Sequence, residues 1–149
     1  MRSYKQPESV LVVVATNSDE VLLLERRDWP GFWQSITGSL EPLETPEQTA
    51  KREVFEEIGL IVPEGALMDC GQATWYTIYP EFRHRYAPGT TQNLEHCFQL
   101  RLPERCIVQI SQEHTRYQWL PASQALTIAK TTTNQAAISR WLLSGREVK

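Results

Sequence analysis

Three glutamates stand close together in the first half of the chain, with a spacing that could bind a metal ion. They are Glu53, Glu56 and Glu57. On a helix that turns about 100° per residue, their side chains fall within one sector roughly 100° wide. Like charges this close repel, and a hard divalent cation such as Mg²⁺ would relieve the repulsion through oxygen ligands. A solvated acidic face is the competing interpretation, and helix geometry alone does not choose between the two.

The residues around these carboxylates predict the helix that would carry them, from Pro46 to Ile58. Thr45 is a suitable N-cap, proline suits the first helical position, and Gln48 completes a Thr-x-x-Gln capping box. Gly59 is a typical C-terminal stop. The same angular arithmetic predicts the stripe that faces the core, which consists of Ala50, Val54, Phe55 and Ile58.

The fixed residues between Gly38 and Leu60 have a recognisable spacing. Gly38 is followed by five residues, Glu44, seven residues and then the segment REVFEEIGL, which starts at Arg52. This pattern is the complete signature of the Nudix hydrolases, and the chain is identified by resemblance as a member of that family. With each residue type used at roughly one in twenty, a chance match is expected on the order of once in 10¹⁰ windows.

The Nudix resemblance implies a fold, a reaction and a cofactor. The fold is α/β, an α/β/α sandwich with a mixed β-sheet, and we expect one domain over residues 1–149 with the signature at 38–60. The family hydrolyses a nucleoside diphosphate linked to some other group, and residues outside the signature choose that group. The metal ligands, for Mg²⁺ or Mn²⁺ in its place, would be Glu53, Glu56, Glu57 and Glu113.

The same resemblance implies catalytic roles. A bound cation would lower the pKa of a water molecule, and either Glu56 or Glu113 would take its proton as general base. Arg52 is counted with the catalytic residues because it is expected to pair with Glu44 and hold the loop against the helix. Taken by itself, Glu113 could equally be a solvated loop residue.

Segments outside the signature resemble the branch of the family that acts on dihydroneopterin triphosphate in folate synthesis. They are Tyr4-Lys5-x-Pro7, Leu23–Asp28, Phe32–Ser35, Arg83–Gly89 and Asn134–Ile138. That reaction releases pyrophosphate and leaves dihydroneopterin monophosphate. By this resemblance, the substrate contacts would be Lys5, Arg26, Thr37, Tyr76, Thr77, Ile78, Tyr79 and Thr131.

Two other functions use the same signature. One is a housecleaning pyrophosphatase that acts on dATP or other purine nucleoside triphosphates. The other is a non-catalytic Nudix ligand sensor, against which the intact signature argues. Single residues also have plainer interpretations: Arg26 could lie at a solvated strand end rather than on phosphate. Likewise, Trp75, Tyr76 and Tyr79 could form sheet core rather than a wall on which a flat heterocycle stacks.

The elements that must position these residues alternate irregularly along the chain, which is typical of a mixed sheet between helices. Short apolar or alternating runs predict the strands Val10–Ala15, Val21–Leu24, Trp33–Thr37, Leu60–Val62, Met68–Tyr79, Leu94–Leu102, Ile107–Ile110 and Arg116–Leu120. Besides the signature helix, we expect helices at Pro121–Leu126 and at Asn134–Leu143, the latter ending at Gly145.

Composition restricts the classes of partner. The chain has 149 residues, 41% hydrophobic and 22% charged, as expected of one globular domain. Its net charge of −3 argues against binding nucleic acid or a membrane surface by bulk charge. Three dispersed cysteines form no CxxC pair, and no apolar run approaches the ~20 residues of a membrane span. We therefore expect a cytoplasmic monomer that acts on a small molecule.

Overall fold

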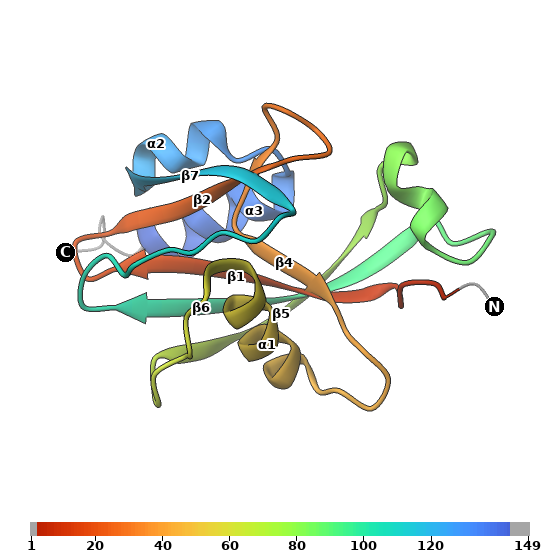
Figure 1. Cartoon of the computed structure of the whole chain (residues 1–149), viewed down its shortest axis with the longest axis horizontal. Coiled ribbons are helices and arrows are strands. Elements are labelled where there is room, and N and C mark those ends of the chain that lie inside the picture. Colours follow the sequence, from red (N-terminus) through yellow and green to blue (C-terminus); the bar gives the residue numbers. More distant parts are fainter. Residues whose placement is uncertain (1–2, 144–149) are drawn as a thin grey trace.

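The computed structural model describes residues 3–143, and within them seven strands form one mixed sheet with helices on both faces (Figure 1). The strands are β1 Glu8–Thr16, β2 Glu20–Arg26, β3 Trp33–Gln34, β4 Ile36–Ser39, β5 Leu67–Thr77, β6 Gln92–Leu102 and β7 His114–Pro121. The α-helices are α1 Pro46–Ile58, α2 Ala122–Ile128 and α3 Thr132–Ile138, with a 3₁₀ helix η1 Pro80–Arg85 and a π-helical turn η2 Ser139–Leu143.

Strand β1 lies at the centre of the sheet and determines where its neighbours go. Strand β6 pairs with it in parallel over its whole length, with Glu8–Thr16 opposite Leu94–Leu102. On the other edge, β4 pairs antiparallel with the first half of β1, whereas β2 pairs with it only at Ala15. This divided edge places Thr37 of β4 beside the start of β1, where the candidate site forms.

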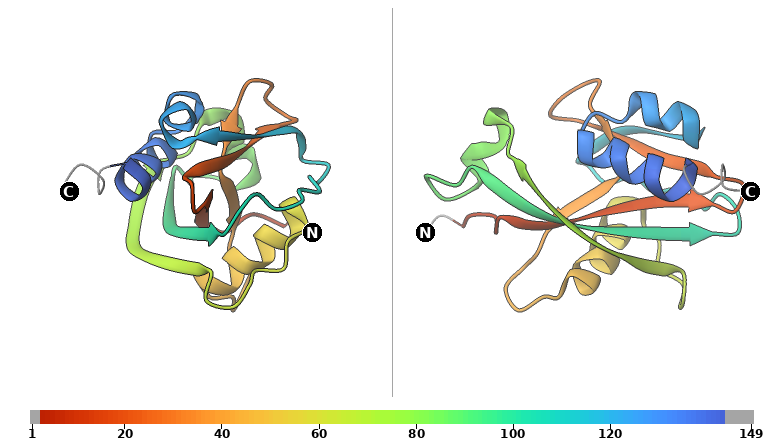
Figure 2. Two further views of the ribbon diagram at one scale, coloured as in Figure 1. Left: turned by 90° about the vertical axis from the view of Figure 1, so that its left-hand side faces the viewer. Right: turned by 180° about the vertical axis from the view of Figure 1, so that it is seen from behind.

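Strand β1 is an unbroken apolar run, and its side chains are buried on both faces of the sheet. Val10, Val12 and Val14 belong to the core under α1, whereas Leu11 and Val13 belong to the core under α2 and α3. Figure 2 shows α1 on one side of the sheet and the pair α2 and α3 on the other. The predicted α/β/α sandwich with a mixed sheet is therefore confirmed.

Helix α1 begins and ends where its local signals predict. The Thr45 side chain accepts a hydrogen bond from the backbone N–H of Gln48, and the Gln48 side chain accepts one from the backbone N–H of Thr45. At the other end, Gly59 adopts the left-handed conformation with φ 75°. This conformation favours glycine because it has no Cβ, so the predicted helix Pro46–Ile58 is confirmed.

The buried stripe of α1 differs from the prediction at one position. Ala50, Val54 and Ile58 pack against the sheet as expected, but Phe55 is 55% exposed. Glu57 is buried in its place, with only 4% exposed. On the helix, Glu57 lies about 20° from Ala50 and Phe55 about 140° from it. The face of α1 that contacts the sheet is therefore centred nearer to Glu57 than to Phe55.

Two predicted strands, Leu60–Val62 and Ile107–Ile110, are not strands in the described part of the chain. The second segment runs across the end of α1, where the backbone N–H of Gln109 donates to the carbonyl of Ile58 at 3.0 Å. The last carbonyls of a helix lack partners within it, and this segment supplies one. It therefore terminates α1 instead of extending the sheet.

Other differences are small. The predicted strand Trp33–Thr37 consists of two short strands, β3 and β4. The last helix starts at Thr132 rather than Asn134, because Thr131 is the N-cap. Its predicted stop, Gly145, lies outside the described residues.

Between residues 3 and 143, no helix is long and apolar enough to cross a membrane.

Candidate active site

Arg52 ties the loop after β4 to helix α1. Its Nε and Nη2 donate to the two carboxylate oxygens of Glu44 at 2.8 and 2.9 Å, and Nη2 also donates to the carbonyl of Ser39 at 3.0 Å. The hydrogen bond from Arg52 holds the pKa of Glu44 at about 2, and the same contact raises the pKa of Arg52. The predicted pairing of these two residues is confirmed, and a two-point contact of this kind fixes orientation as well as distance.

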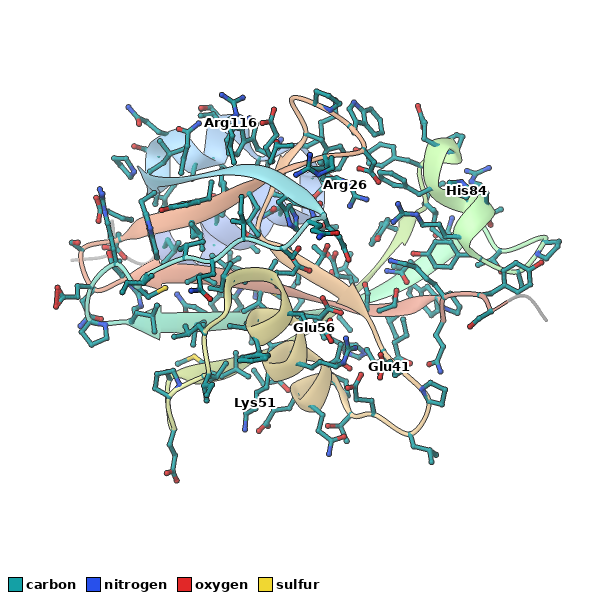
Figure 3. All side chains as sticks on the ribbon, viewed as in Figure 1. Arg26, Glu41, Lys51, Glu56, His84 and Arg116 are labelled. Carbon is teal, nitrogen blue, oxygen red and sulfur yellow. The ribbon has the colours of Figure 1, made fainter. Side chains whose placement is uncertain are left out.

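The remaining donor of Arg52 is shared by two of the predicted metal ligands. Nη1 donates to Glu53 at 2.7 Å and to Glu56 at 3.2 Å. Figure 3 shows Glu56 on α1, and its side chain is half exposed. Arg52 therefore contacts Glu44, Glu53 and Glu56 at the same time.

Glu53 and Glu57 form a buried carboxyl pair on successive turns of α1. Their side chains share a hydrogen bond, and burial raises the pKa of both, that of Glu57 well above its ordinary value. The Oε1 atom of Glu57 is buried without a hydrogen-bond partner among the described residues, and the Nε2 atom of His114 lies 3.7 Å from it. A carboxyl pair in these surroundings requires either a shared proton or a cation.

Gly38 makes room for this pair. A Cβ atom at Gly38 would lie 2.0 Å from Cδ and 2.3 Å from Oε2 of Glu53, far inside van der Waals contact. The glycine of the signature is therefore required by close packing of β4 on α1, and not by an unusual backbone angle. Any larger residue would displace the Glu53 carboxylate.

Glu113 lies on an exposed loop that Arg27 holds in place. The Nε atom of Arg27 donates to the carbonyl of Gln112 at 2.7 Å, and its backbone N–H donates to the carbonyl of Glu113 at 2.9 Å. Of the two arginines that end β2, Arg27 thus serves the backbone of this loop. The fixed loop keeps the Glu113 carboxylate at the edge of the same hollow as Glu57.

The four predicted metal ligands do not form a ready cluster. Among residues 3–143, no three His, Cys, Asp or Glu side chains converge on a point where an ion could sit. Arg52 holds Glu56 to one side, and Glu113 is on a separate loop. The Glu53–Glu57 pair does fit Mg²⁺, which usually takes one or two carboxylates and completes its shell with water and substrate phosphates. The unpaired Oε1 of Glu57 is the observation that supports this fit.

A cavity of about 350 Å³ opens beside the carboxylates, within the range of small-molecule sites. All eight residues predicted to contact substrate line it: Lys5, Arg26, Thr37, Tyr76, Thr77, Ile78, Tyr79 and Thr131. A second hollow of about 450 Å³ contains Glu57 and Glu113, and it shares part of its wall with the first. The shared wall, which we call the junction, consists of Lys5, Arg26, Gln34, Thr37 and Arg85.

Three cations meet at the junction. Asp28 binds Arg26 and Arg85 with contacts of 2.8 Å each, and Figure 3 shows Arg26 at the end of β2 that faces the segment carrying His84. Lys5 completes the group, and its pKa is lowered by burial and by the two neighbouring guanidinium groups. Clustered like charges in a partly buried site favour a multiply charged anion, such as a polyphosphate.

The aromatic wall differs from the prediction. Trp75 is 63% exposed and does not line the cavity, because it points to the opposite face of β5 from Tyr76. The rings that do gather are those of Trp29, Phe32, Tyr79 and Phe82, with centroids 5.1 to 6.2 Å apart. They join the loop after β2 to η1, and Phe32, Tyr79 and Phe82 also line the cavity.

Helix α3 is held against the sheet by a buried amide. Asn134 Oδ1 accepts from the backbone N–H of Ser35 at 2.7 Å, and its Nδ2 donates to the Ser35 hydroxyl at 3.0 Å. Both residues are fully buried. This contact sets the position of Thr131, which caps the helix and lines the cavity.

Sequence reasoning missed Glu95, which also lines the cavity. It is only 6% exposed, and burial raises its pKa to about 7. The sequence carried no clear signal, since Glu95 is one of six polar residues among the eleven of β6. Arg85 belongs to the segment Arg83–Gly89, which carries part of the family resemblance, and it reaches the junction while His84 stays exposed.

Comparisons with known proteins agree with this geometry. The NUDIX domain family model matches residues 5–142. Over 145 residues the chain is 46% identical to the dihydroneopterin triphosphate diphosphatase of Escherichia coli, covering 95% of each protein. It is 40% identical over 149 residues to the Haemophilus influenzae protein of that name, covering 98% of this chain and 94% of the other. The structure of the E. coli dihydroneopterin triphosphate pyrophosphohydrolase superposes with a TM-score of 0.90 at 42% identity, over 95% of this chain and 99% of that one.

Proposed function

Because the chain belongs to the Nudix hydrolase family, we propose that it cleaves dihydroneopterin triphosphate to dihydroneopterin monophosphate and pyrophosphate. The observation that carries the proposal is the cavity itself, in a chain 46% identical to an enzyme of that name. The part of the cavity away from the junction is walled by Tyr76 of β5, Glu95 of β6 and the start of α3, and it suits a flat heterocycle. The other end opens through the junction toward Glu57 and Glu113, as a triphosphate substrate requires.

The cations of the junction would bind the phosphates. Arg26 and Arg85 are prepositioned by Asp28, so little side-chain freedom is lost when they contact phosphate oxygens. An anionic ligand would stabilise the charged form of Lys5, because phosphate would offset the repulsion from both guanidinium groups. In phosphoryl transfer, such alignment and charge neutralisation supply most of the catalysis.

Nudix hydrolases generally use a divalent cation, and here Glu53 and Glu57 would hold Mg²⁺, with Glu56 and Glu113 as further ligands. The ion would supply positive charge at the phosphates and lower the pKa of a water molecule. Either Glu56 or Glu113 would accept that proton as general base. Arg52 would keep the signature loop against α1 during turnover.

We further propose that the protein acts as a cytoplasmic monomer. Its net charge of −3 argues against binding to a membrane surface by bulk charge. Size-exclusion chromatography with light scattering would measure the mass directly, against 17.2 kDa for one chain.

The test is a competition in one tube between dihydroneopterin triphosphate and dATP with Mg²⁺, with products separated by chromatography. We expect a higher kcat/KM for the pterin substrate, pyrophosphate as product, and no turnover after chelation of the metal. Adenine offers a flat face but a different hydrogen-bonding edge, and polar sites discriminate strongly against such analogues. Preference for dATP would indicate a purine nucleotide pyrophosphatase, and release of orthophosphate would contradict the cleavage position.

A further inference from the structure

Glu95 is a buried carboxyl that the mechanism above does not use. It lies in the first half of β6, opposite Ser9 of β1 and Thr74 of β5, and is 6% exposed. Within residues 3–143 it forms no ion pair with Lys, Arg or His, and its side chain receives a hydrogen bond from Thr133. A buried carboxyl with so little compensation weakens a fold, because it must either ionise in a poorly solvated place or stay protonated.

The position of Glu95 in the cavity points to a ligand. Glu95, Tyr76 and Thr133 line the cavity but not the hollow that contains Glu57 and Glu113. The junction lies between these two groups. A ligand whose phosphates lie at the junction would therefore place its heterocycle at Glu95, and this step rests on the proposed function.

We propose that Glu95 is the specificity-determining residue of the cavity, recognising the 2-amino-4-oxopyrimidine ring that reduced pterins share with guanine. That ring presents a ring N–H beside an exocyclic amino group. An ionised carboxylate accepts both hydrogen bonds in parallel, as it does from the paired donors of arginine. Adenine presents a donor beside an acceptor, which would leave one carboxylate oxygen facing a lone pair.

The replacement Glu95→Gln changes this pattern while keeping the shape of the side chain. A carboxamide offers one acceptor and one donor, which matches adenine rather than a pterin. We expect kcat/KM for dihydroneopterin triphosphate to fall about tenfold or more, with that for dATP unchanged or raised, in line with the value of one lost bidentate contact. Glu8→Gln is the matched control, because Glu8 lies on β1 outside the cavity and binds His96.

Two further measurements test the same contact, the first with wild-type protein and the second without metal. For wild-type protein, kcat/KM should be about tenfold higher for GTP than for ITP, which lacks the 2-amino group. This difference should disappear in Glu95→Gln. In the presence of EDTA, fluorescence titration with neopterin should show about tenfold weaker binding to Glu95→Gln than to wild type. Glu95→Asp keeps the charge on a side chain that is one methylene shorter. It should also lose the selectivity for dihydroneopterin triphosphate over dATP.

The outcomes separate this inference from the proposed function. If wild-type protein fails to hydrolyse dihydroneopterin triphosphate, the proposed function fails, while the GTP and ITP comparison still tests Glu95. If Glu95→Gln keeps the wild-type ratio of pterin to dATP rates, or lowers both rates equally, the inference is overturned. An equal fall would mean that Glu95 only supports the cavity wall.

Discussion

Glutamates at this site differ in chemistry because their surroundings differ. Glu44 accepts two hydrogen bonds from an arginine and has a pKa of about 2. Glu53 and Glu57 are buried side by side, and both pKa values rise. Glu95 is buried away from any cation in the described chain, with a pKa of about 7. Glu113 is exposed on a loop that Arg27 holds through the backbone.

Glu113→Gln tests whether this exposed carboxylate takes part in the chemistry. We expect kcat to fall about 10²-fold, with KM little changed, because a carboxamide cannot accept a proton at neutral pH. Steady-state kinetics at saturating Mg²⁺ measures both constants. Glu104→Gln is the control, an exposed acidic residue outside the cavity. An unchanged kcat would make Glu113 a solvated residue, and a change confined to KM would assign it to substrate binding.

At the scale of elements, the site depends on how closely α1 approaches β4. The capping box fixes where the helix starts, and the segment after residue 106 covers its end. Gly38 then allows the helix face with Glu53 to lie directly on the strand. The backbone at Gly38 is ordinary, so the constraint there is space for one side chain.

Gly38→Ala should therefore separate activity from stability. Its Cβ would collide with the flexible end of Glu53, which can move, so we expect the free energy of unfolding to change by no more than about 1 kcal/mol. Activity should fall at least about tenfold, since a displacement of about 1 Å at a reacting group can cost more than that.

A double-variant cycle checks the cause. If Gly38→Ala acts through Glu53, it should add little to the loss already caused by Glu53→Gln. Urea denaturation of all four proteins gives the stability control. Full activity in Gly38→Ala, or losses that simply multiply, would contradict this account.

At the scale of the whole molecule, the cavity is built from distant parts of the chain. Lys5 comes from the N-terminal segment, Arg26 from β2, Tyr76 from β5 and Thr131 from the start of α3. The backbone N–H of Lys5 donates to the carbonyl of Arg85 at 2.9 Å, which joins the N-terminal segment to η1. The local positive field therefore exists only in the folded protein, on a chain whose net charge is −3.

Global stability should depend on pH through Glu95. Its folded pKa of about 7 is above the ordinary 4.5, so the folded state binds the proton more tightly than the unfolded state does. Stability is therefore highest below pH 4.5 for this group and declines as pH rises to about 7. The full decline is about 3 kcal/mol.

Urea denaturation of wild type and Glu95→Gln at pH 5, 6, 7 and 8 measures this contribution. The variant should gain stability relative to wild type as pH rises, and the difference should level off above pH 7. Glu104→Gln, at an exposed position outside the cavity, serves as the control. A constant difference between Glu95→Gln and wild type would contradict a buried titrating carboxyl.

The sequence by itself determined the family, the helix Pro46–Ile58 with its caps, and most strands, because these signals are local in spacing and period. Only the tertiary structure decided that Glu57 rather than Phe55 is buried, since burial depends on where the sheet touches the helix. It also brought residues 5, 26, 76 and 131 to one cavity and placed Glu95 in its wall. Such convergence follows from strand pairing across long stretches of chain, for which no local pattern carries a signal.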